Sequence, residues 1–233
     1  MCSQFENLVP IADLLNITDA TTIADSSVND NWSRHVYPYA KAAVITRGES
    51  NNVLQLMQYS LVPNWSKTAK PKFSSYNARL DREGKHNQLE RIYQTPTWNI
   101  PFSRKHCIVP LTSFFESCTT GTHAGNIVRF AAEQPDNILL AAGIWDSWTD
   151  NSSGEIIDSF AIITDEPTPF LLEVGHDRQP VFLTQQNAEY WLNQQQTPVQ
   201  WYDFLKDNQN PVNYQVSDFR QLKGWGDTHD LFS

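Results

Sequence analysis

Cysteine is scarce in this chain, and its few cysteines form no metal-binding or disulfide pattern. Among 233 residues there are three, Cys2, Cys107 and Cys118, with no Cys-x-x-Cys pair and no cluster with histidine. An odd, widely spaced set argues against both a zinc site and a disulfide framework. We therefore expect no metal and no other cofactor, and we place the protein in a reducing compartment, the cytoplasm.

Long apolar runs, a signal peptide and internal repeats are also missing. No stretch approaches the ~18 uninterrupted apolar residues that a membrane span needs, and no basic region followed by an apolar run opens the chain. These absences argue against a membrane partner, and no linker divides the sequence. Since a typical domain has ~150 residues, we expect a single domain over residues 1–233 and a monomer.

What the chain does have is an apolar content that predicts a β-rich fold. Hydrophobic residues make up 40% of it and there are eight tryptophans, which is too much apolar surface for a disordered chain. Segments rich in Val, Ile, Phe and Trp and bounded by Gly, Pro or Asn are expected to form strands. They are Ala42–Thr46, Val53–Val62, Cys107–Leu111, Asn126–Ala132, Ile138–Trp145, Ile156–Thr164 and Val181–Leu183.

Helices are expected to be few and short. Gln185–Gln195 follows Thr184, a good N-cap, and places apolar residues on one face. Pro167–Val174 has a proline near its start and a glycine at its end. The other helical candidates are Leu8–Leu15 and Gln200–Lys206. Because strands outnumber helices without alternating with them, we predict an α+β fold with a mostly antiparallel sheet or barrel, followed by a helical C-terminal extension at 184–233.

Charge is distributed unevenly along the chain. The net charge of −9 by itself argues against a nucleic-acid partner. However, residues 34–105 hold twelve of the seventeen Lys and Arg and only four acidic residues, a local charge of +8, whereas the remainder carries −17. A locally basic segment can present a positive groove in an acidic protein, or its cations can be spread over several faces. Composition leaves both arrangements open.

The second residue is the most informative candidate for chemistry. Removal of the initiator methionine is expected when a small residue follows it, so the mature chain would begin with Cys2, which carries an amine and a thiol on adjacent carbons. Ordinary pKa values of about 8 and about 8.5 leave both groups partly deprotonated at neutral pH. Such an aminothiol condenses with an aldehyde to an imine, and the thiol then closes a thiazolidine ring. Taken alone, position 2 also fits a permissible small residue, because most free cysteines are inert.

Three later segments carry residue types that suit acid–base chemistry or phosphate binding. Asn77 and Arg79 supply an amide and a guanidinium. Glu116 follows two phenylalanines, and apolar contact raises the pKa of a carboxyl, which suits it to proton transfer. A polar turn places His176 and Arg178 just before an apolar strand. Each segment alone also fits a structural role, as a polar loop, a solvent-facing glutamate or a surface turn.

Taken together and in this order, these motifs resemble the SRAP family (SOS-response-associated peptidase, also called abasic-site processing proteins). The family pattern is an initial Met-Cys, then Asn-Ala-Arg, an aromatic-Glu after an apolar strand, and His-Asp-Arg-x-Pro, and all four are found between Cys2 and Leu183. The segment Leu61-Val62-Pro63-Asn64-Trp65 also looks like one that precedes Asn-Ala-Arg in the family. The resemblance implies a pseudo-symmetric β-rich SRAP-like fold with a positive groove for single-stranded DNA, and a role in DNA repair.

The resemblance also implies a role for each motif residue. Cys2 would capture the aldehyde of a ring-opened abasic site as a thiazolidine DNA–protein crosslink that shields the lesion. Asn77 would sense the opened sugar, Glu116 would assist ring opening, imine formation and crosslink reversal, and His176 would lie near the lesion's oxygen and phosphate. Lyase and autopeptidase activities are further implied. The residues implied in DNA binding are Arg79, Arg178, Trp65, Lys67 and Thr164, with Trp65 as a base-stacking wedge.

Two alternatives stay open, and some positions depart from the family pattern. One alternative is a thiol peptidase that uses Cys2 with the histidine and glutamate; the other is a single-strand binder that does not need Cys2. The place of Cys2 directly after the first methionine favours the aminothiol, since an ordinary cysteine peptidase needs no free α-amine on that residue. Ser3 and Gln4 stand where many members have Gly-Arg, which removes a cation beside the nucleophile, and Asp81 stands where glutamate is usual.

Overall fold

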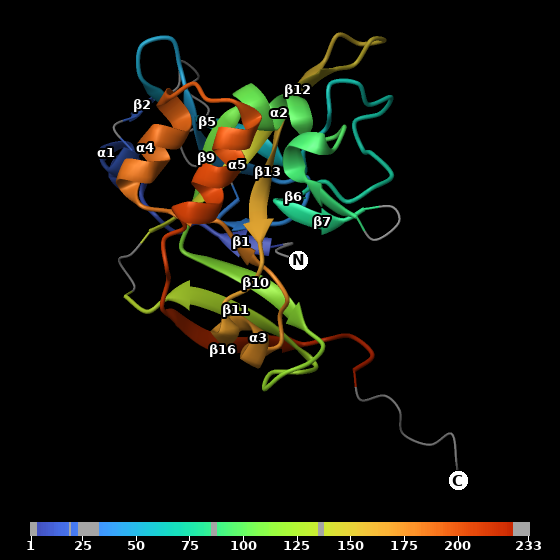
Figure 1. Cartoon of the computed structure of the whole chain (residues 1–233), viewed down its shortest axis with the longest axis vertical. Helices are drawn as coiled ribbons and strands as arrows, with labels where there is room; N and C mark the ends of the chain where they lie inside the picture. Colours follow the sequence, from blue (N-terminus) through green and yellow to red (C-terminus); the bar gives the residue numbers. More distant parts are fainter. Residues whose placement is uncertain (1–3, 19, 23–32, 85–87, 135–137, 226–233) are drawn as a thin grey trace.

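The fold is built from two β-sheets, with most of the short helices gathered around the larger one. The computed structural model describes residues 4–18, 20–22, 33–84, 88–134 and 138–225. Within these ranges the strands form a nine-stranded sheet, a five-stranded sheet and a two-stranded ladder. In Figure 1 the larger sheet with α4 and α5 makes up the upper part, and β10, β11 and β16 lie in the lower part. The predicted α+β class with mostly antiparallel strands is confirmed.

The larger sheet closes into a small barrel. Its main strands are β4 (Lys41–Arg47), β5 (Asn52–Tyr59), β9 (His106–Leu111), β12 (Leu139–Thr149) and β13 (Ile156–Asp165). They pair in the order β13-β12-β9-β4-β5, and the parallel pairing of Phe160 with Tyr59 joins β13 back to β5. The shorter strands added to this ring are β2 (Ala20–Thr22), β6 (Asn77–Arg79), β14 (Gln179–Pro180) and β15 (Phe182–Leu183).

The smaller sheet places the first strand of the chain in its interior. Its order is β16-β11-β10-β1-β3, from β16 (Tyr214–Gln221), β11 (Asn126–Ala132), β10 (Ser113–Cys118), β1 (Gln4–Glu6) and β3 (His35–Val36). Phe5 of β1 is fully buried, and its ring lies 5.2 Å from Tyr59 of the barrel. Phe114 stacks on Phe130 at 5.0 Å within the same apolar core. The core between the two sheets therefore anchors the chain near its N-terminus.

Three of the helices begin with a capping threonine, and one of these, Thr184, was predicted from the sequence. The helices are α1 (Ile11–Thr18), α2 (Asn99–Arg104), α3 (Pro169–Val174), α4 (Gln185–Asn193) and α5 (Pro198–Asp207), with a 3-10 turn at Ile92–Gln94. The side chains of Thr168, Thr184 and Thr197 each accept a hydrogen bond from the backbone at the start of α3, α4 and α5. In the part of the chain described, no helix has the length and apolar character needed to cross a bilayer.

Two predictions about local structure need correction, and some elements were not predicted. Tyr214–Gln221, expected within a helical extension, is strand β16, because it pairs along its length with β11; the helices of this region end at Asp207. Asn77–Arg79, which also fitted a loop, is strand β6, since it pairs with β13. α2 was not predicted, and two short strands, β7 (Asp81–Glu83) and β8 (Leu89–Arg91), form their own ladder.

Candidate functional site

A buried carboxylate and a buried imidazole form the centre of the candidate site. Glu116 lies on β10 and only 1% of its surface is exposed. Its neighbours two residues away on the strand, Phe114 and Cys118, are part of the apolar core. His176 is 6% exposed, and its Nε2 lies 3.2 Å from Oε2 of Glu116. Burying such a pair is costly unless the groups satisfy each other. The sequence singled out both residues, and the fold brings them together from positions 60 residues apart.

The position of His176 is set by the end of helix α3. The helix ends at Gly175, which has a φ of 119°, in the left-handed region that favours glycine. A Cβ atom at this position would lie 1.8 Å from the backbone oxygen of Thr120. The backbone N–H of His176 then donates to the carbonyl of Leu171 at 2.9 Å. Glycine therefore lets the chain turn tightly and direct the imidazole towards Glu116.

Four of the other predicted site residues meet at one end of β13. β6 pairs with β13 in parallel, with Asn77 opposite Ile162 and Arg79 opposite Thr164. On the other side of β13, Pro180 of β14 is opposite Thr164, which brings Arg178, two residues earlier, to the same end. Three strands that are far apart in sequence thus assemble Asn77, Arg79, Thr164 and Arg178 into one cluster.

This cluster contains polar atoms that lack partners among the described residues. They are both side-chain amide atoms of Asn77, the hydroxyl of Thr164 and Nε of Arg178. Buried polar groups are nearly always hydrogen-bonded in native proteins, so an unpaired group calls for an explanation such as a bound ligand. Burial lowers the pKa of Arg178, and the neighbouring positive charge of Arg79 lowers it further. Two close guanidinium groups with unused donors are suited to bind an anion such as a phosphate.

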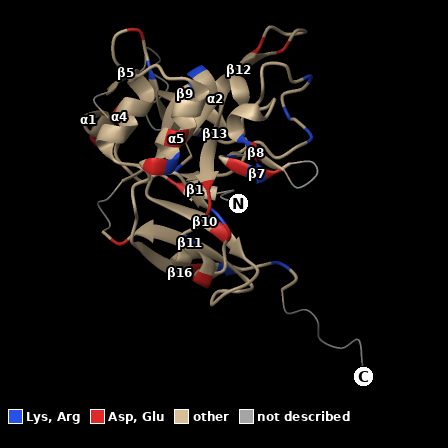
Figure 2. Ribbon diagram, in the orientation of Figure 1, with Lys and Arg blue, Asp and Glu red and all other residues tan. Residues whose placement is uncertain are grey.

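Trp65 and Lys67 lie apart from this cluster, on the loop between β5 and β6. Trp65 is 53% exposed and stacks on Phe73, itself 41% exposed, at 6.2 Å between ring centroids. The same loop carries three exposed lysines, Lys67, Lys70 and Lys72. Figure 2 shows basic residues in this region. Exposed aromatic rings beside lysines suit the stacking of bases and the attraction of a nucleic-acid backbone. The contribution of Phe73 was not foreseen, because no pattern in the sequence pairs it with the tryptophan.

The base of this loop is anchored to the barrel by a buried aspartate that sequence reasoning also missed. Asp146 on β12 is 1% exposed; its Oδ2 accepts a hydrogen bond from the backbone N–H of Asn64 at 2.8 Å. Its Oδ1 lies 2.6 Å from Nζ of Lys105. Lys105 belongs to the basic segment 34–105, as does Arg82, which is paired with Glu90. Part of the positive charge of that segment therefore serves the fold instead of a groove.

Cys2, the expected nucleophile, lies outside the described residues. The described chain begins at Gln4, which is opposite Phe115 in the pairing of β1 with β10. The other two cysteines, Cys107 and Cys118, are buried. Burial raises the pKa of the Cys107 thiol, and burial together with the charge of Glu116 raises that of Cys118 to about 11. Both thiols are thus poor nucleophiles at neutral pH.

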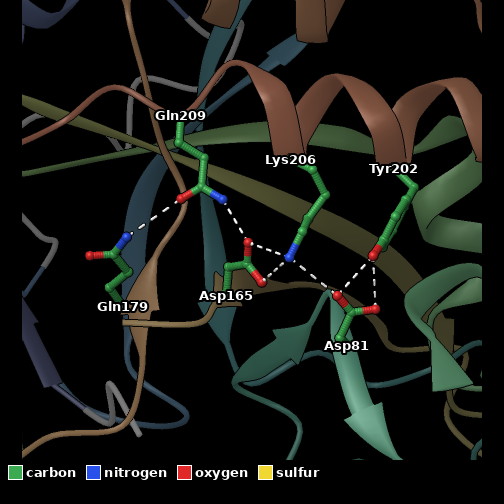
Figure 3. A network of polar contacts seen from close by, with 6 residues as sticks. All are labelled: Asp81, Asp165, Gln179, Tyr202, Lys206 and Gln209. Carbon is green, nitrogen blue, oxygen red and sulfur yellow. Dashed lines mark hydrogen bonds and ion pairs between the residues drawn. The ribbon is translucent and has the colours of Figure 1, made fainter. Parts of the chain in front are cut away.

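A network of polar side chains not foreseen from the sequence lies next to the arginine cluster. Figure 3 shows Lys206 between Asp81 and Asp165, with its Nζ 3.2 Å from Asp81 Oδ2 and 2.9 Å from Asp165 Oδ1. The hydroxyl of Tyr202 donates to Asp81, and the side-chain amide of Gln209 donates to Asp165 at 2.6 Å. The network links α5 and Gln209, which lies shortly after this helix, to Asp81 of β7 and Asp165 of β13. No group of three or more His, Cys, Asp or Glu side chains able to hold a metal ion is found in the described ranges.

Comparison with known proteins decides the family. The family model "SOS response associated peptidase (SRAP)" matches residues 1–219. The chain belongs to this family. A relative from Bacillus subtilis (strain 168), abasic site processing protein YoqW, is 30% identical over 191 residues, covering 79% of each chain. Another, abasic site processing protein HMCES from Pongo abelii, is 25% identical over 173 residues, which are 62% of this chain and 46% of that protein.

Solved structures show that the SRAP fold is shared at low sequence identity. A crystal structure of a protein from Bacteroides thetaiotaomicron superposes with a TM-score of 0.73 at 21% identity, covering 94% of this chain and 92% of that one. One from Bordetella bronchiseptica gives 0.71 at 19% identity and covers 94% and 100%. The SRAP-like fold expected from the motifs is therefore confirmed.

Proposed function

We propose that this SRAP protein processes abasic sites in single-stranded DNA by forming a covalent thiazolidine crosslink through Cys2. The observation that carries the proposal is the buried Glu116–His176 pair, at 3.2 Å, whose carboxylate lies on β10, the strand that pairs with β1. The names of the relatives from Bacillus subtilis and Pongo abelii, abasic site processing proteins, support the substrate class. An acid–base pair beside an N-terminal aminothiol suits condensation with an aldehyde.

The short distance along the chain between Cys2 and strand β1 supports the participation of Cys2. Gln4 is opposite Phe115 in the pairing of β1 with β10, and Phe115 precedes Glu116. Cys2 is two residues before Gln4, and two residues span at most about 7 Å. The length of the chain between Cys2 and β1 therefore allows the terminal aminothiol to reach the strand that carries the carboxyl group.

The proposed reaction needs only proton transfers and releases one water. The α-amine of Cys2 adds to the aldehyde carbon of the ring-opened sugar, and loss of the hydroxyl as water gives an imine. The thiol sulfur then adds to that carbon, and the thiol proton passes to the nitrogen, which closes the thiazolidine ring. We assign the protonation of the departing hydroxyl to Glu116, with His176 holding and exchanging its proton. Because no redox step occurs, no cofactor is required.

Strand binding is assigned to the cluster on β13 and to the loop that precedes β6. Arg79 and Arg178 would contact phosphates, while the unpaired amide of Asn77 would hydrogen-bond to the opened sugar. Trp65 would stack on a base beside the lesion and Lys67 would contact the backbone. These contacts explain why partnerless polar atoms are found there, since a bound strand would satisfy them.

A crosslinking assay tests the proposal. The protein is incubated with a single-stranded oligonucleotide in which uracil glycosylase has converted one uracil to an abasic site, and the products are resolved after heating. We expect a heat-stable shifted band for the natural chain and no band for Cys2→Ala. Cys118→Ala is the matched control: its thiol has a raised pKa, so its removal should leave the band intact.

The alternatives give different results in the same assay. A single-strand binder would retain intact and abasic strands equally and form no heat-stable band. A thiol peptidase that uses Cys2 would cleave peptides and react with thiol-directed peptide probes without an aldehyde. Absence of the band in material whose Met1 is shown by mass spectrometry to be removed contradicts the proposal.

A further inference from the structure

The two arginines of the cluster are unusual in lacking an acidic partner although carboxylates lie close by. Among the described residues no carboxylate lies within ion-pair distance of Arg79 or Arg178. Yet Asp165 directly follows Thr164, which is opposite Arg79, and the charges of Asp177, Asp165 and Glu166 act on Arg178. A guanidinium with a carboxylate in reach ordinarily forms a bidentate pair with it. For Asp81 and Asp165, other partners account for the missing ion pairs.

The polar network on α5 engages the oxygens of both carboxylates. Tyr202 donates to both oxygens of Asp81, at 2.9 and 2.8 Å, and Lys206 donates to Oδ2. Lys206 also donates to both oxygens of Asp165, at 2.9 and 3.0 Å, and Gln209 adds a hydrogen bond to Oδ2 at 2.6 Å. The side chains of Asp81 and Asp165 are only 13% and 5% exposed, so water contributes little to their neutralisation. Figure 3 shows Lys206 between them.

The protonation states fit this arrangement. Burial works against the charge on Lys206, but its hydrogen bonds to the two carboxylates outweigh that cost and raise its pKa. Burial and the hydrogen bond to Asp81 raise the pKa of Tyr202 to about 12, so its hydroxyl keeps its proton and stays a donor at neutral pH. Two negative charges therefore face one fixed positive charge and two further donors.

We propose that Lys206 is a positioning residue for anion binding: it holds Asp81 and Asp165 so that Arg79 and Arg178 stay available to a DNA phosphate. The inference rests on the proposed function in that it takes the anion to be the phosphate of a single strand. Without Lys206, the aspartates would regain their attraction for the two guanidinium groups and compete with the phosphate. Lys206 itself would not contact the DNA.

Binding of unmodified single-stranded DNA tests this inference. Affinity is measured by fluorescence anisotropy over a range of salt concentrations for the natural chain, Lys206→Met and Lys206→Met/Asp165→Asn. Lys223→Met is the matched control, because it removes one positive charge from an exposed position outside the network. We expect Lys206→Met to bind about tenfold more weakly, with the slope of log affinity against log salt reduced by about 0.7 for each phosphate that the arginines no longer neutralise. The double variant should recover most of the lost affinity, because Tyr202 still donates to both oxygens of Asp81. Lys223→Met should bind within about twofold of the natural chain.

Two results would overturn the inference. Lys206→Met that binds as well as Lys223→Met shows that the lysine does not matter for anion binding. A double variant as weak as Lys206→Met shows that Lys206 contacts the strand or only supports the fold. If Lys206→Met does not fold, as judged by its thermal unfolding, Gln209→Leu is substituted and Asp165→Asn must again restore binding. Since unmodified DNA carries no aldehyde, failure of the crosslink to form would leave this result unchanged.

Discussion

Glu116 and His176 are the residues on which the proposed chemistry depends most directly. Both side chains are more than nine-tenths buried, and their polar atoms lie 3.2 Å apart. Glu116 lies on β10, which pairs with β1 and contributes Phe114 and Cys118 to the apolar core. Holding a carboxyl group and an imidazole in an apolar surrounding costs stability. Such an arrangement is typical of a site in which protons must be moved, since active sites are where proteins retain costly buried charges.

Glu116→Gln tests this role at the scale of a single residue. The amide has nearly the same shape as the carboxyl group but cannot give or take a proton, so we expect crosslink formation to slow by about 100-fold or more. The measurement is the rate of band formation at saturating abasic DNA. Glu173→Gln, on an exposed position of α3, should keep the natural rate. A natural rate in Glu116→Gln would remove the carboxyl group from the mechanism.

At the scale of elements, the end of helix α3 controls where the imidazole lies. Two glycines with positive φ separate the effect of backbone strain from that of crowding: Gly175 with φ 119° is pressed against Thr120, whereas Gly154 with φ 75° has no atom within 4 Å of a Cβ. Alanine is strained at either position. At Gly175 it also collides with a backbone oxygen, which cannot move without displacing the chain.

This difference in crowding predicts a large difference in stability between the two alanine variants. We expect Gly175→Ala to lower the free energy of unfolding by more than about 2 kcal/mol, and Gly154→Ala by about 1 kcal/mol. Urea unfolding curves give both values. Gly175→Ala should also crosslink poorly, because His176 is displaced. Equal losses of stability in the two variants would show that the close approach of position 175 to Thr120 does not affect the free energy of unfolding.

The loop that carries Trp65 is expected to bind DNA but to take no part in the chemistry. Removing one base–aromatic stack costs about 1–3 kcal/mol, so Trp65→Ala should weaken binding to intact and abasic strands alike by about tenfold. The crosslinking rate at saturating DNA should not change. Trp225→Ala, at a tryptophan that is 41% exposed near the C-terminal end, is the control. If Trp65→Ala lowered the saturating rate instead, the wedge would belong to the catalytic site.

Local signals in the sequence predicted many of the elements, and long-range pairing accounts for the strands β6 and β16 that were missed. Thr184 begins helix α4 because its side chain accepts a backbone hydrogen bond, and Gly175 ends α3 because it adopts a left-handed conformation. Both signals depend only on residues that are neighbours in sequence. Strand β6 has a polar sequence and becomes a strand only because β13 offers it backbone partners. Strand β16 is exposed along most of its length, so it lacks the apolar alternation that would distinguish it from the helices before it.

At the scale of the whole molecule, the packing of helices on the barrel should make stability depend on pH. His106 on β9 is stacked on Trp191 of α4 at 3.6 Å, and its ring nitrogens lie 2.8 and 2.9 Å from the carbonyl oxygens of Phe102 and Trp191. Burial prevails over these two hydrogen bonds and lowers the pKa of His106 to about 4. Between this value and the ordinary 6.5, the unfolded chain binds a proton that the folded chain does not.

The sign of the pH dependence follows from that difference. The stability contributed by neutral His106 is fully present above about pH 6.5 and is lost as the pH falls towards 4, by about 1.4 kcal/mol per pH unit. His106→Gln should lack this part of the slope when unfolding free energies at about pH 6.5 and about pH 4.5 are compared. His123→Gln, a variant at a more exposed histidine, should retain it. Equal slopes in the natural chain and His106→Gln would contradict the assignment.

The site as a whole was less predictable than its members. The residue types of Asn77, Glu116 and His176 could be selected from their motifs, but the sequence did not predict that Glu116 and His176 would lie within 3.2 Å of each other. The network around Lys206 had no signal at all, because its members come from β7, β13, α5 and the segment after α5 and become partners only in the folded chain.

The intact mass of the protein after reaction with an abasic oligonucleotide tests the central claim most directly. We predict a single adduct whose mass equals that of the chain without Met1 plus the oligonucleotide, less one water, with the bond mapped to Cys2. An adduct of the same kind formed by a chain that still carries Met1 or a blocked α-amine would contradict this prediction, since neither could form a thiazolidine at the second residue.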